Sequence, residues 1–382
     1  GTGLARTGTN TPRTTFAKRT AHTMWWPHLS LFAPPLRVAV VGAGAIGGEF
    51  ALRNFGRPTG TSVVGVVDCN EAAARSLALS VGCPSFTSLR EALEACDPEL
   101  IYIGTPPSTH RELVEASLAA DCHVLLEKPL AASGADGDAI VAAAEAAASR
   151  GVLLGLNIGM RWNEAQVRMR QLALEERAVG RLSGGSLELH FAAWPRSWQR
   201  VPWCAGRAEG GPLREVGTHF LFGLQEIFGA RCVRRVRATV TYPADGRLCE
   251  SGAEGELELD GLVLALRVTT DGSATEESGG DDRYELRLDG EGGRSLLLED
   301  FTSLRLEQPL PRGSRTVVER APYGRRESVE SVAGAVRKIR GERDGGSGLP
   351  PPRITAREAR EAQAVLDAIL ASDGEWVVPE YL

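Results

Sequence analysis

The sequence predicts an α/β fold in which an N-terminal, doubly wound parallel sheet is followed by an α+β domain with a large, mostly antiparallel open sheet. Up to residue 158, short β-branched or apolar runs alternate with helix-compatible segments, which is the pattern of a parallel sheet between helices. Beyond that point strand patterns dominate, and short turns such as Asp260-Gly261 join several of them. We therefore expect one domain over 36–158 and a second over 159–382.

Composition and charge narrow the class of protein. With 382 residues the chain is long enough for two domains, each with its own core. The net charge of −6 provides no basic field for nucleic acid, and no apolar stretch is long enough to span a bilayer. The cysteines form no CxxC pair and no metal-ligand spacing, which favours a reducing compartment. We expect no nucleic-acid partner, no membrane partner, no metal site and a cytoplasmic location.

The segment 1–35 differs from the rest of the chain. It is rich in threonine and carries basic but no acidic residues, a composition compatible with a transit peptide for a mitochondrion or plastid. The alternatives are a disordered extension, or sequence upstream of a true start at Met24. The fold argument therefore begins at Leu36.

The first domain is expected to open with a strand, a glycine-rich loop and a helix. The run 36–41 leads into Gly42-Ala43-Gly44-Ala45-Ile46-Gly47 and then into a helix-compatible segment, which is the context of a dinucleotide-binding (Rossmann) fingerprint. In this motif the first glycine permits a tight turn, the second lets the backbone approach a pyrophosphate, and the third allows close packing of helix and strand. The helix N-terminus would then face the phosphates. The alternative is a glycine turn without a ligand.

The other elements of this domain follow in alternation. Strands are expected at 62–67, 100–104, 123–126 and 152–156, and helices at 72–80, at 88–95, at 138–149 and up to 119. The carboxyl ends of parallel strands lie along one edge of the sheet, where ligands bind. Polar residues that follow these strands are therefore the candidates for a cofactor site.

Asp68, at the end of the second strand, is the candidate ribose ligand. A carboxylate at this position accepts hydrogen bonds from the adenosine ribose and repels a 2′-phosphate, which favours NAD over NADP. Asp68 could instead cap the helix that starts near Glu71. Arg75 on that helix keeps NADP as the alternative cofactor.

The tripeptide Glu127-Lys128-Pro129 ends the strand 123–126. A half-buried lysine ammonium at this edge needs an anionic or polar partner. Pro129 restricts the backbone of Lys128, and the bond between them could be cis. A solvated loop lysine is the alternative, but the glycine loop, Asp68 and Thr105 along the same edge favour a single cofactor crevice.

The second domain is expected to combine helices with an open sheet. Helices are expected over 163–176, from Pro212 to about 228, and over 355–372. Strands are expected at 186–192, 233–242, 255–260, 262–269, 284–288 and 295–298. The acidic or glycine-rich segments 271–282 and 345–352 are typical of loops.

The helix that starts at Pro212 carries the second candidate group. Glu215 and His219 are four residues apart and share a helix face, so the carboxylate would raise the pKa of the imidazole and fix its tautomer. The alternative is an ordinary ion pair on a helix surface, although the flanking residues are apolar. Three upstream tryptophans could wall a ring-bearing substrate: Trp194, Trp198 and Trp203.

From Leu36 to its C-terminus the chain resembles the Gfo/Idh/MocA family of NAD(P)-dependent oxidoreductases. The resemblance rests on the order and spacing of five motifs: the 42–47 loop, Thr105-Pro106-Pro107 with His110, Glu127-Lys128-Pro129, Arg161, and the helix start 211–219. It implies a Rossmann domain and a mixed α/β domain whose open sheet forms homodimers or homotetramers. Lys128 matches the lysine that contacts substrate and nicotinamide, His219 matches the catalytic histidine, and Glu215 stands where the family has Asp.

Together, the motifs and the resemblance imply a set of residues around the cofactor. The expected cofactor-binding residues are Gly42, Ala43, Gly44, Ala45, Ile46, Gly47, Asp68, Thr105, Pro106, Pro107, His110, Glu127, Lys128 and Arg161.

The expected activity is hydride transfer between NAD and a secondary alcohol of a sugar, cyclitol or related compound. His219 would accept the hydroxyl proton, Lys128 would stabilise the developing alkoxide, and Glu215 would orient His219. Two alternatives stay open. One is an NAD-dependent glycosidase, or an imine or dihydrodiol reductase, of the same fold. The other is a catalytically silent NAD-binding sensor.

Overall fold

The computed structural model describes residues 34–199, 201–271, 281–341 and 355–382. The segment 1–35 therefore lies almost wholly outside the described residues. The same holds for most of the loops expected at 271–282 and 345–352.

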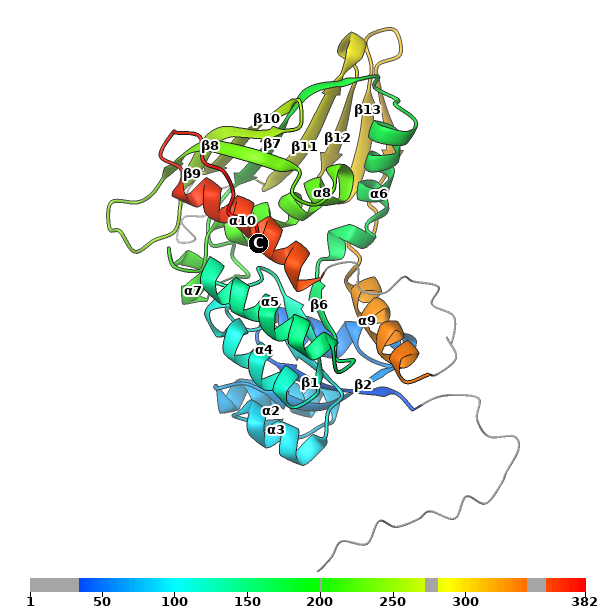
Figure 1. Ribbon diagram of the computed structural model, residues 1–382, viewed down its shortest axis with the longest axis vertical. Coiled ribbons are helices and arrows are strands. Elements are labelled where there is room, and N and C mark those ends of the chain that lie inside the picture. Colours follow the sequence, from blue (N-terminus) through cyan, green and yellow to red (C-terminus); the bar gives the residue numbers. More distant parts are fainter. Residues whose placement is uncertain (1–33, 200, 272–280, 342–354) are drawn as a thin grey trace, which may run out of the picture. The chain divides into compact units, whose positions relative to one another are not determined.

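The first sheet is parallel throughout its described length and has the strand order β3-β2-β1-β4-β5-β6 (Figure 1). The strands are β1 (Leu36–Val41), β2 (Thr61–Val67), β3 (Ser85–Phe86), β4 (Leu100–Ile103), β5 (His123–Glu127) and β6 (Leu154–Asn157). The strand order reverses between β1 and β4, and in doubly wound sheets ligands bind outside the carboxyl ends of the strands at this point. The predicted doubly wound parallel sheet is confirmed.

Both faces of this sheet are buried. Successive strand residues point to opposite sides, so each strand contributes side chains to an apolar cluster on either face. Val38 and Val40 belong to one apolar cluster, and Ala39 and Val41 belong to another. The helices of this part are α1 (Ala45–Glu49), α2 (Glu71–Val81), α3 (Leu89–Cys96), α4 (His110–Ala119) and α5 (Gly134–Ala148).

A helix from the C-terminal part of the chain also packs on this sheet. Helix α9 (Arg325–Ile339) places Val329, Val332 and Val336 in the same cluster as Val38 and Val40. The sequence analysis missed α9, although apolar residues at spacings of three and four are a helical signal. The chain thus returns to the first sheet after passing through the second.

The second sheet has the order β14-β13-β12-β11-β7-β10-β9-β8 in the described part of the chain. Its strands are β7 (Leu182–Phe191), β8 (Val233–Thr241), β9 (Gly252–Leu259), β10 (Leu262–Thr270), β11 (Arg283–Gly290), β12 (Ser295–Glu299), β13 (Ser303–Glu307) and β14 (Ser314–Val318). Neighbours are antiparallel except for β7 and β10. The mostly antiparallel sheet is confirmed, while β13 and β14 were not predicted.

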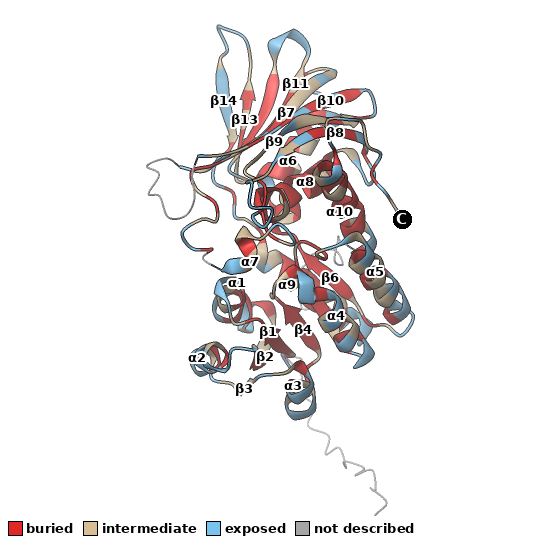
Figure 2. Ribbon diagram, turned by 90° about the vertical axis from the view of Figure 1, so that its left-hand side faces the viewer, coloured by how far each residue is buried: buried red, intermediate tan, exposed pale blue. Residues whose placement is uncertain are grey.

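Helices cover one face of the second sheet (Figures 1 and 2). They are α6 (Glu164–Arg170), α8 (Thr218–Phe228) and α10 (Ala356–Ala371), and the short α7 (Pro202–Ala205) precedes α8. The strand residues that face these helices, such as Leu187 and Leu189, are buried. The opposite face carries cross-strand ion pairs such as Arg237–Glu256 and Arg287–Glu307. This part of the chain is therefore an α+β domain. Helices cover one face of its sheet, and the other face is charged and uncovered in the described part of the chain.

Candidate active site

The glycine loop has the geometry of a dinucleotide-binding turn. Gly42 has φ +99°, and a Cβ on it would lie 2.6 Å from the Gly104 carbonyl oxygen. A Cβ on Gly47 would lie 1.8 Å from the Gly42 oxygen, so only glycine lets α1 approach β1 this closely. A Cβ on Gly44 would meet nothing within 4 Å. The first and third glycines are thus required by packing, and the second leaves space for a ligand.

Asp68 lies beside this loop at the end of β2. One carboxylate oxygen accepts a hydrogen bond from the Ala43 N–H (2.7 Å), and the other accepts one from the Asn70 N–H (2.8 Å). Helix α2 is capped by the Asn70 side chain, which accepts from the Ala73 N–H. Asp68 therefore does not cap α2, and its carboxylate is held against the glycine loop.

His110 connects the loops that follow β4 and β5. The ring is fully buried, with Nε2 3.0 Å from the Thr105 carbonyl oxygen and Nδ1 3.1 Å from that of Pro129. Burial lowers the pKa of His110. Both nitrogens face backbone oxygens, so His110 holds the two loops together rather than presenting a nitrogen to a cofactor. Thr105, Pro106 and Pro107 form the turn above it, and Pro107 begins the short 3₁₀ helix η3 (Pro107–Thr109).

Glu127 is buried at the end of β5. Its Oε1 accepts hydrogen bonds from the Tyr102 hydroxyl (2.8 Å) and from Nδ2 of Asn157 (2.5 Å). Burial raises the pKa of the Glu127 carboxyl. Asn157 ends β6, so the rule that placed Asp68 and Lys128 at strand ends would also have found it.

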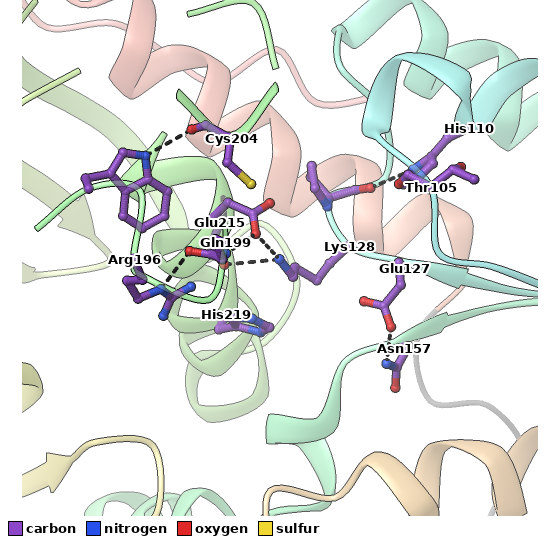
Figure 3. Close-up of polar contacts among 12 residues, drawn as sticks. Thr105, His110, Glu127, Lys128, Asn157, Arg196, Gln199, Cys204, Glu215 and His219 are labelled. Carbon is purple, nitrogen blue, oxygen red and sulfur yellow. Dashed lines mark hydrogen bonds and ion pairs between the residues drawn. The ribbon is translucent and has the colours of Figure 1, made fainter. Parts of the chain in front are cut away.

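Lys128 points from the first sheet toward the second domain (Figure 3). The Lys128–Pro129 bond is cis. The ammonium donates to Oε2 of Glu215 (3.1 Å) and to the Glu215 backbone oxygen (3.2 Å), and the side chain is 14% exposed. The expected anionic or polar partner is therefore the Glu215 carboxylate, and the solvated loop lysine is excluded.

The segment before α8 is wound as a π-helix, η6 (Leu213–Gly217). Its start is held by Glu250, whose Oε1 accepts from the Leu213 N–H (2.8 Å). Glu215 on this turn accepts from Lys128 and from Nε2 of Gln199 (3.1 Å), and its Oε1 is buried without a hydrogen-bond partner among the described residues. Because a π turn differs in winding from an α turn, the i,i+4 rule for side-chain contacts does not apply here.

The predicted contact between Glu215 and His219 is wrong. The Tyr323 hydroxyl lies 2.7 Å from Nδ1 of His219, while the Glu215 carboxylate contacts Lys128 and Gln199. The expected rise in the pKa of His219 is also wrong. Burial lowers it well below 6.5, and the charges of Lys128, Arg325 and Arg196 lower it further. The imidazole is therefore neutral near pH 7.

The upstream tryptophans have different surroundings. Trp194 is buried and donates from Nε1 to the Cys204 carbonyl oxygen (3.0 Å), whereas Trp198 is 53% exposed. The Arg196 guanidinium lies over the rings of Trp194 and Trp198 and donates to Oε1 of Gln199 (2.7 Å). Trp194 thus packs the interior, and Arg196 and Gln199 connect Trp198 to Glu215.

Arg161, which was assigned to the cofactor, lies in a buried ionic group. The guanidinium is paired with Glu226 of α8 (3.0 Å) and Glu358 of α10 (3.6 Å). These contacts connect η4 (Gly159–Trp162) to two helices of the second domain. They give Arg161 a structural role, and its contact with the cofactor stays a prediction.

The expectations of no metal site and no membrane partner can be compared with the described residues only. Within them no three His, Cys, Asp or Glu side chains are grouped so as to hold a metal ion. No helix in the same ranges is both long and apolar enough to cross a membrane.

Fold and site together define a class of two-domain proteins in which a Rossmann-type dinucleotide-binding domain is joined to an α+β domain with an open sheet. Residues 36–156 match the model of an oxidoreductase family with an NAD-binding Rossmann fold, GFO_IDH_MocA. Over this segment the chain is similar to the Gfo/Idh/MocA family.

Relatives of known name align with part of the chain. Over 147 residues it is 35% identical to inositol 2-dehydrogenase 4 of Saccharopolyspora erythraea, which covers 38% of this chain and 43% of that protein. Over 184 residues it is 34% identical to 1,5-anhydro-D-fructose reductase of Ensifer adhaerens, which covers 48% of this chain and 54% of that protein. The chain thus spans about half the length of the curated relatives it matches.

Solved structures share the fold over most of the chain. An oxidoreductase domain protein from Kribbella flavida superposes with a TM-score of 0.72 at 20% identity, covering 91% of this chain and all (100%) of that chain. Levoglucosan dehydrogenase in complex with NADH gives a TM-score of 0.71 at 18% identity, with the same coverage of 91% and 100%. At this identity the likeness establishes the fold alone.

Proposed function

We propose that this protein is an NAD-dependent oxidoreductase that transfers a hydride between the nicotinamide ring and a secondary alcohol of a sugar or cyclitol. One observation carries the proposal: Lys128, at the carboxyl end of β5, reaches the helix start that bears Glu215 and His219 (Figure 3). An ammonium, a carboxylate and a neutral imidazole thus converge where a parallel sheet binds ligands. The names of the aligned relatives, inositol dehydrogenases and sugar reductases, support a polyhydroxylated substrate.

The residues of the glycine loop fit a dinucleotide. A Cβ on Gly44 would meet nothing within 4 Å, which leaves space for a pyrophosphate, and the N-terminus of α1 that follows has no side-chain cap among the described residues. Asp68 presents a fixed carboxylate that would accept from a ribose and repel a 2′-phosphate, which favours NAD over NADP. The cofactor would supply the hydride acceptor, and the chain would supply position and electrostatics.

In the oxidative direction the substrate hydroxyl loses its proton to His219. The low pKa of His219 keeps it in the neutral form that a base requires. Lys128 donates a hydrogen bond to the same oxygen and stabilises the alkoxide that develops as the hydride leaves. The unpartnered Oε1 of Glu215 accepts a hydrogen bond from a neighbouring substrate hydroxyl.

A panel of sugars, cyclitols and uronic acids, incubated with NAD, tests this function. We expect that oxidation of at least one compound yields reduced cofactor and ketone in equal amounts. With glycosides of the same sugars added to the panel, release of an aglycone without net reduced cofactor would indicate the glycosidase instead. NAD binding without any reaction across the panel would favour the sensor.

A further inference from the structure

His219 has an uncharged partner from a distant part of the chain. The Tyr323 hydroxyl lies 2.7 Å from Nδ1 and 3.3 Å from Nε2 of His219, and both side chains are half-buried. The rings meet nearly at right angles, with centroids 5.7 Å apart. Phe301 packs edge-on against both of them. No carboxylate is hydrogen-bonded to the His219 ring in the part of the chain that the structure describes.

The loop that carries Tyr323 is held in place on both sides. A Cβ on Gly159 would lie 2.5 Å from the Tyr323 carbonyl oxygen, so only glycine allows this approach. Gly324 has φ +90°, and the Pro322 oxygen accepts from Nδ2 of Asn163 (3.0 Å). These contacts hold the backbone on both sides of Tyr323.

Charged groups around His219 come from three elements. Lys128 faces the ring from the end of β5, and Arg196 faces it from the loop after β7. The charge of Arg325, at the start of α9, also lowers the pKa of His219, and Arg325 lies over the Tyr323 ring and pairs with Glu49 of α1. Cations therefore face the imidazole, and the nearest hydrogen-bonding group is neutral.

We propose that Tyr323 is the positioning residue of His219: its hydroxyl holds Nδ1, which leaves Nε2 as the nitrogen that exchanges a proton with the substrate. This inference rests on the proposed function, because it assigns a partner to the base of that reaction. Tyr323 thereby takes the orienting role that was predicted for Glu215. The Glu215 carboxylate instead accepts hydrogen bonds from Lys128 and Gln199.

A hydroxyl suits a base that must work in both directions. In the base-competent tautomer, Nδ1–H donates to the Tyr323 oxygen and Nε2 carries the lone pair. On oxidation the substrate O–H bond breaks and its proton moves to Nε2. The carbinol C–H bond breaks as the C=O bond of the ketone forms, and bound NAD would accept the hydride. The imidazolium that forms keeps its Nδ1–H bond to Tyr323, and on reduction of a ketone the proton returns from Nε2 to the substrate oxygen.

Because the Tyr323 hydroxyl is uncharged, it affects the pKa of His219 differently from a carboxylate. A carboxylate would stabilise the imidazolium strongly and raise the pKa of His219, whereas a hydroxyl does so only through one hydrogen bond. Because bonds from charged donors are the stronger ones, loss of the Tyr323 hydroxyl should favour the neutral form of His219. The acid limb of the pH profile should then move to lower pH.

The kinetic test compares Tyr323→Phe with Tyr381→Phe. Tyr381 is a matched control because its hydroxyl also forms a hydrogen bond, which it donates to the Val233 carbonyl oxygen (2.5 Å), and it belongs to the C-terminal segment. Tyr323→Phe should lower kcat about 10- to 100-fold, leave the Kd for NAD unchanged, and shift the acid limb of kcat/KM to lower pH. Tyr381→Phe should leave all three values unchanged. Equal profiles for the two variants would overturn the inference.

A spectroscopic test does not depend on activity. Nitrogen-15 NMR of the imidazoles, with the His219 signal identified by its loss in His219→Asn, should show the proton of the neutral ring on Nδ1. A proton on Nε2 in the wild-type protein, or an unchanged His219 signal in Tyr323→Phe, would contradict the assignment. An inactive wild-type protein would refute the proposed function and leave this measurement to decide the role of Tyr323.

Discussion

At the residue scale, the site shows which contacts a sequence can predict. The need of Lys128 for an anion followed from its place at a strand end, and the structure supplies that anion. The identity of the anion did not follow, because Glu215 is 87 positions away and its distance from Lys128 is set by how the two domains pack. For the same reason Tyr323, 104 positions after His219, could not have been found from spacing.

The ion pair between Lys128 and Glu215 leads to the prediction at this scale. Glu215→Gln should lower the free energy of unfolding by about 3 kcal/mol, because it leaves a largely buried ammonium without its anion. Turnover should fall as well, because Lys128 loses the group that aims it. Denaturant unfolding and steady-state kinetics measure the two effects.

Glu258→Gln is the matched control. Glu258 makes an exposed ion pair with Arg235, and such pairs contribute less than about 1 kcal/mol. We expect the free energy of unfolding to fall clearly further in Glu215→Gln than in Glu258→Gln. If both unfold at the same denaturant concentration, Lys128 and Glu215 do not form the buried pair described above.

At the element scale, local patterns were sufficient where the strands are regular. The parallel strands of the first sheet appear as apolar runs, and each was expected within two residues of its observed bounds except β3, which has two residues. β13 was missed although Leu304 and Leu306 alternate with polar residues, which is a strand signal, and β14 was missed because its first three residues are polar. α9 was missed because its apolar stripe is narrow and its other faces are charged.

The glycine loop provides the prediction at the element scale. Gly44→Ala should fold normally, since a Cβ there meets nothing within 4 Å and the residue has φ −72°, but it should weaken NAD binding at least about 10-fold by filling the pyrophosphate space. Gly47→Ala should instead cost about 2 kcal/mol of stability, because its Cβ would lie 1.8 Å from the Gly42 oxygen.

Thermal unfolding and NAD titration separate the two variants. Each serves as the control of the other, since both add one methyl group to the same loop. Undiminished NAD affinity in a well-folded Gly44→Ala protein would show that the loop is a turn without a ligand.

At the scale of the whole molecule, the C-terminal part of the chain connects the two sheets. Helix α9 packs on the first sheet, and α10 contacts both α5 and α8. Arg325, at the start of α9, pairs with Glu49 immediately after the glycine loop. The segment that carries Tyr323 and Arg325 therefore contacts both His219 and the residue that follows the glycine loop.

The uncovered face of the second sheet leads to the prediction at this scale. We predict a homodimer or homotetramer formed through this face, which carries charged residues and the exposed Val263 of β10. Because charge pairs would contribute to such an interface, the mass should fall toward that of one chain between about 0.1 M and 1 M salt. Light scattering after size exclusion measures it.

Val263→Glu should weaken the assembly at low salt by adding a charge to this face. Leu79→Glu is the control, because Leu79 is exposed on α2, in the other domain. The mass of a single chain at every salt concentration would refute the prediction.

The central claim is that Lys128 and His219 carry out chemistry on a substrate at a bound NAD. Its most direct test measures NAD affinity and substrate-dependent formation of reduced cofactor for the wild-type protein, Lys128→Ala and His219→Ala. We expect both variants to keep the Kd for NAD of the wild-type protein and to turn over at least about 100-fold more slowly. Near wild-type turnover in both variants would contradict it.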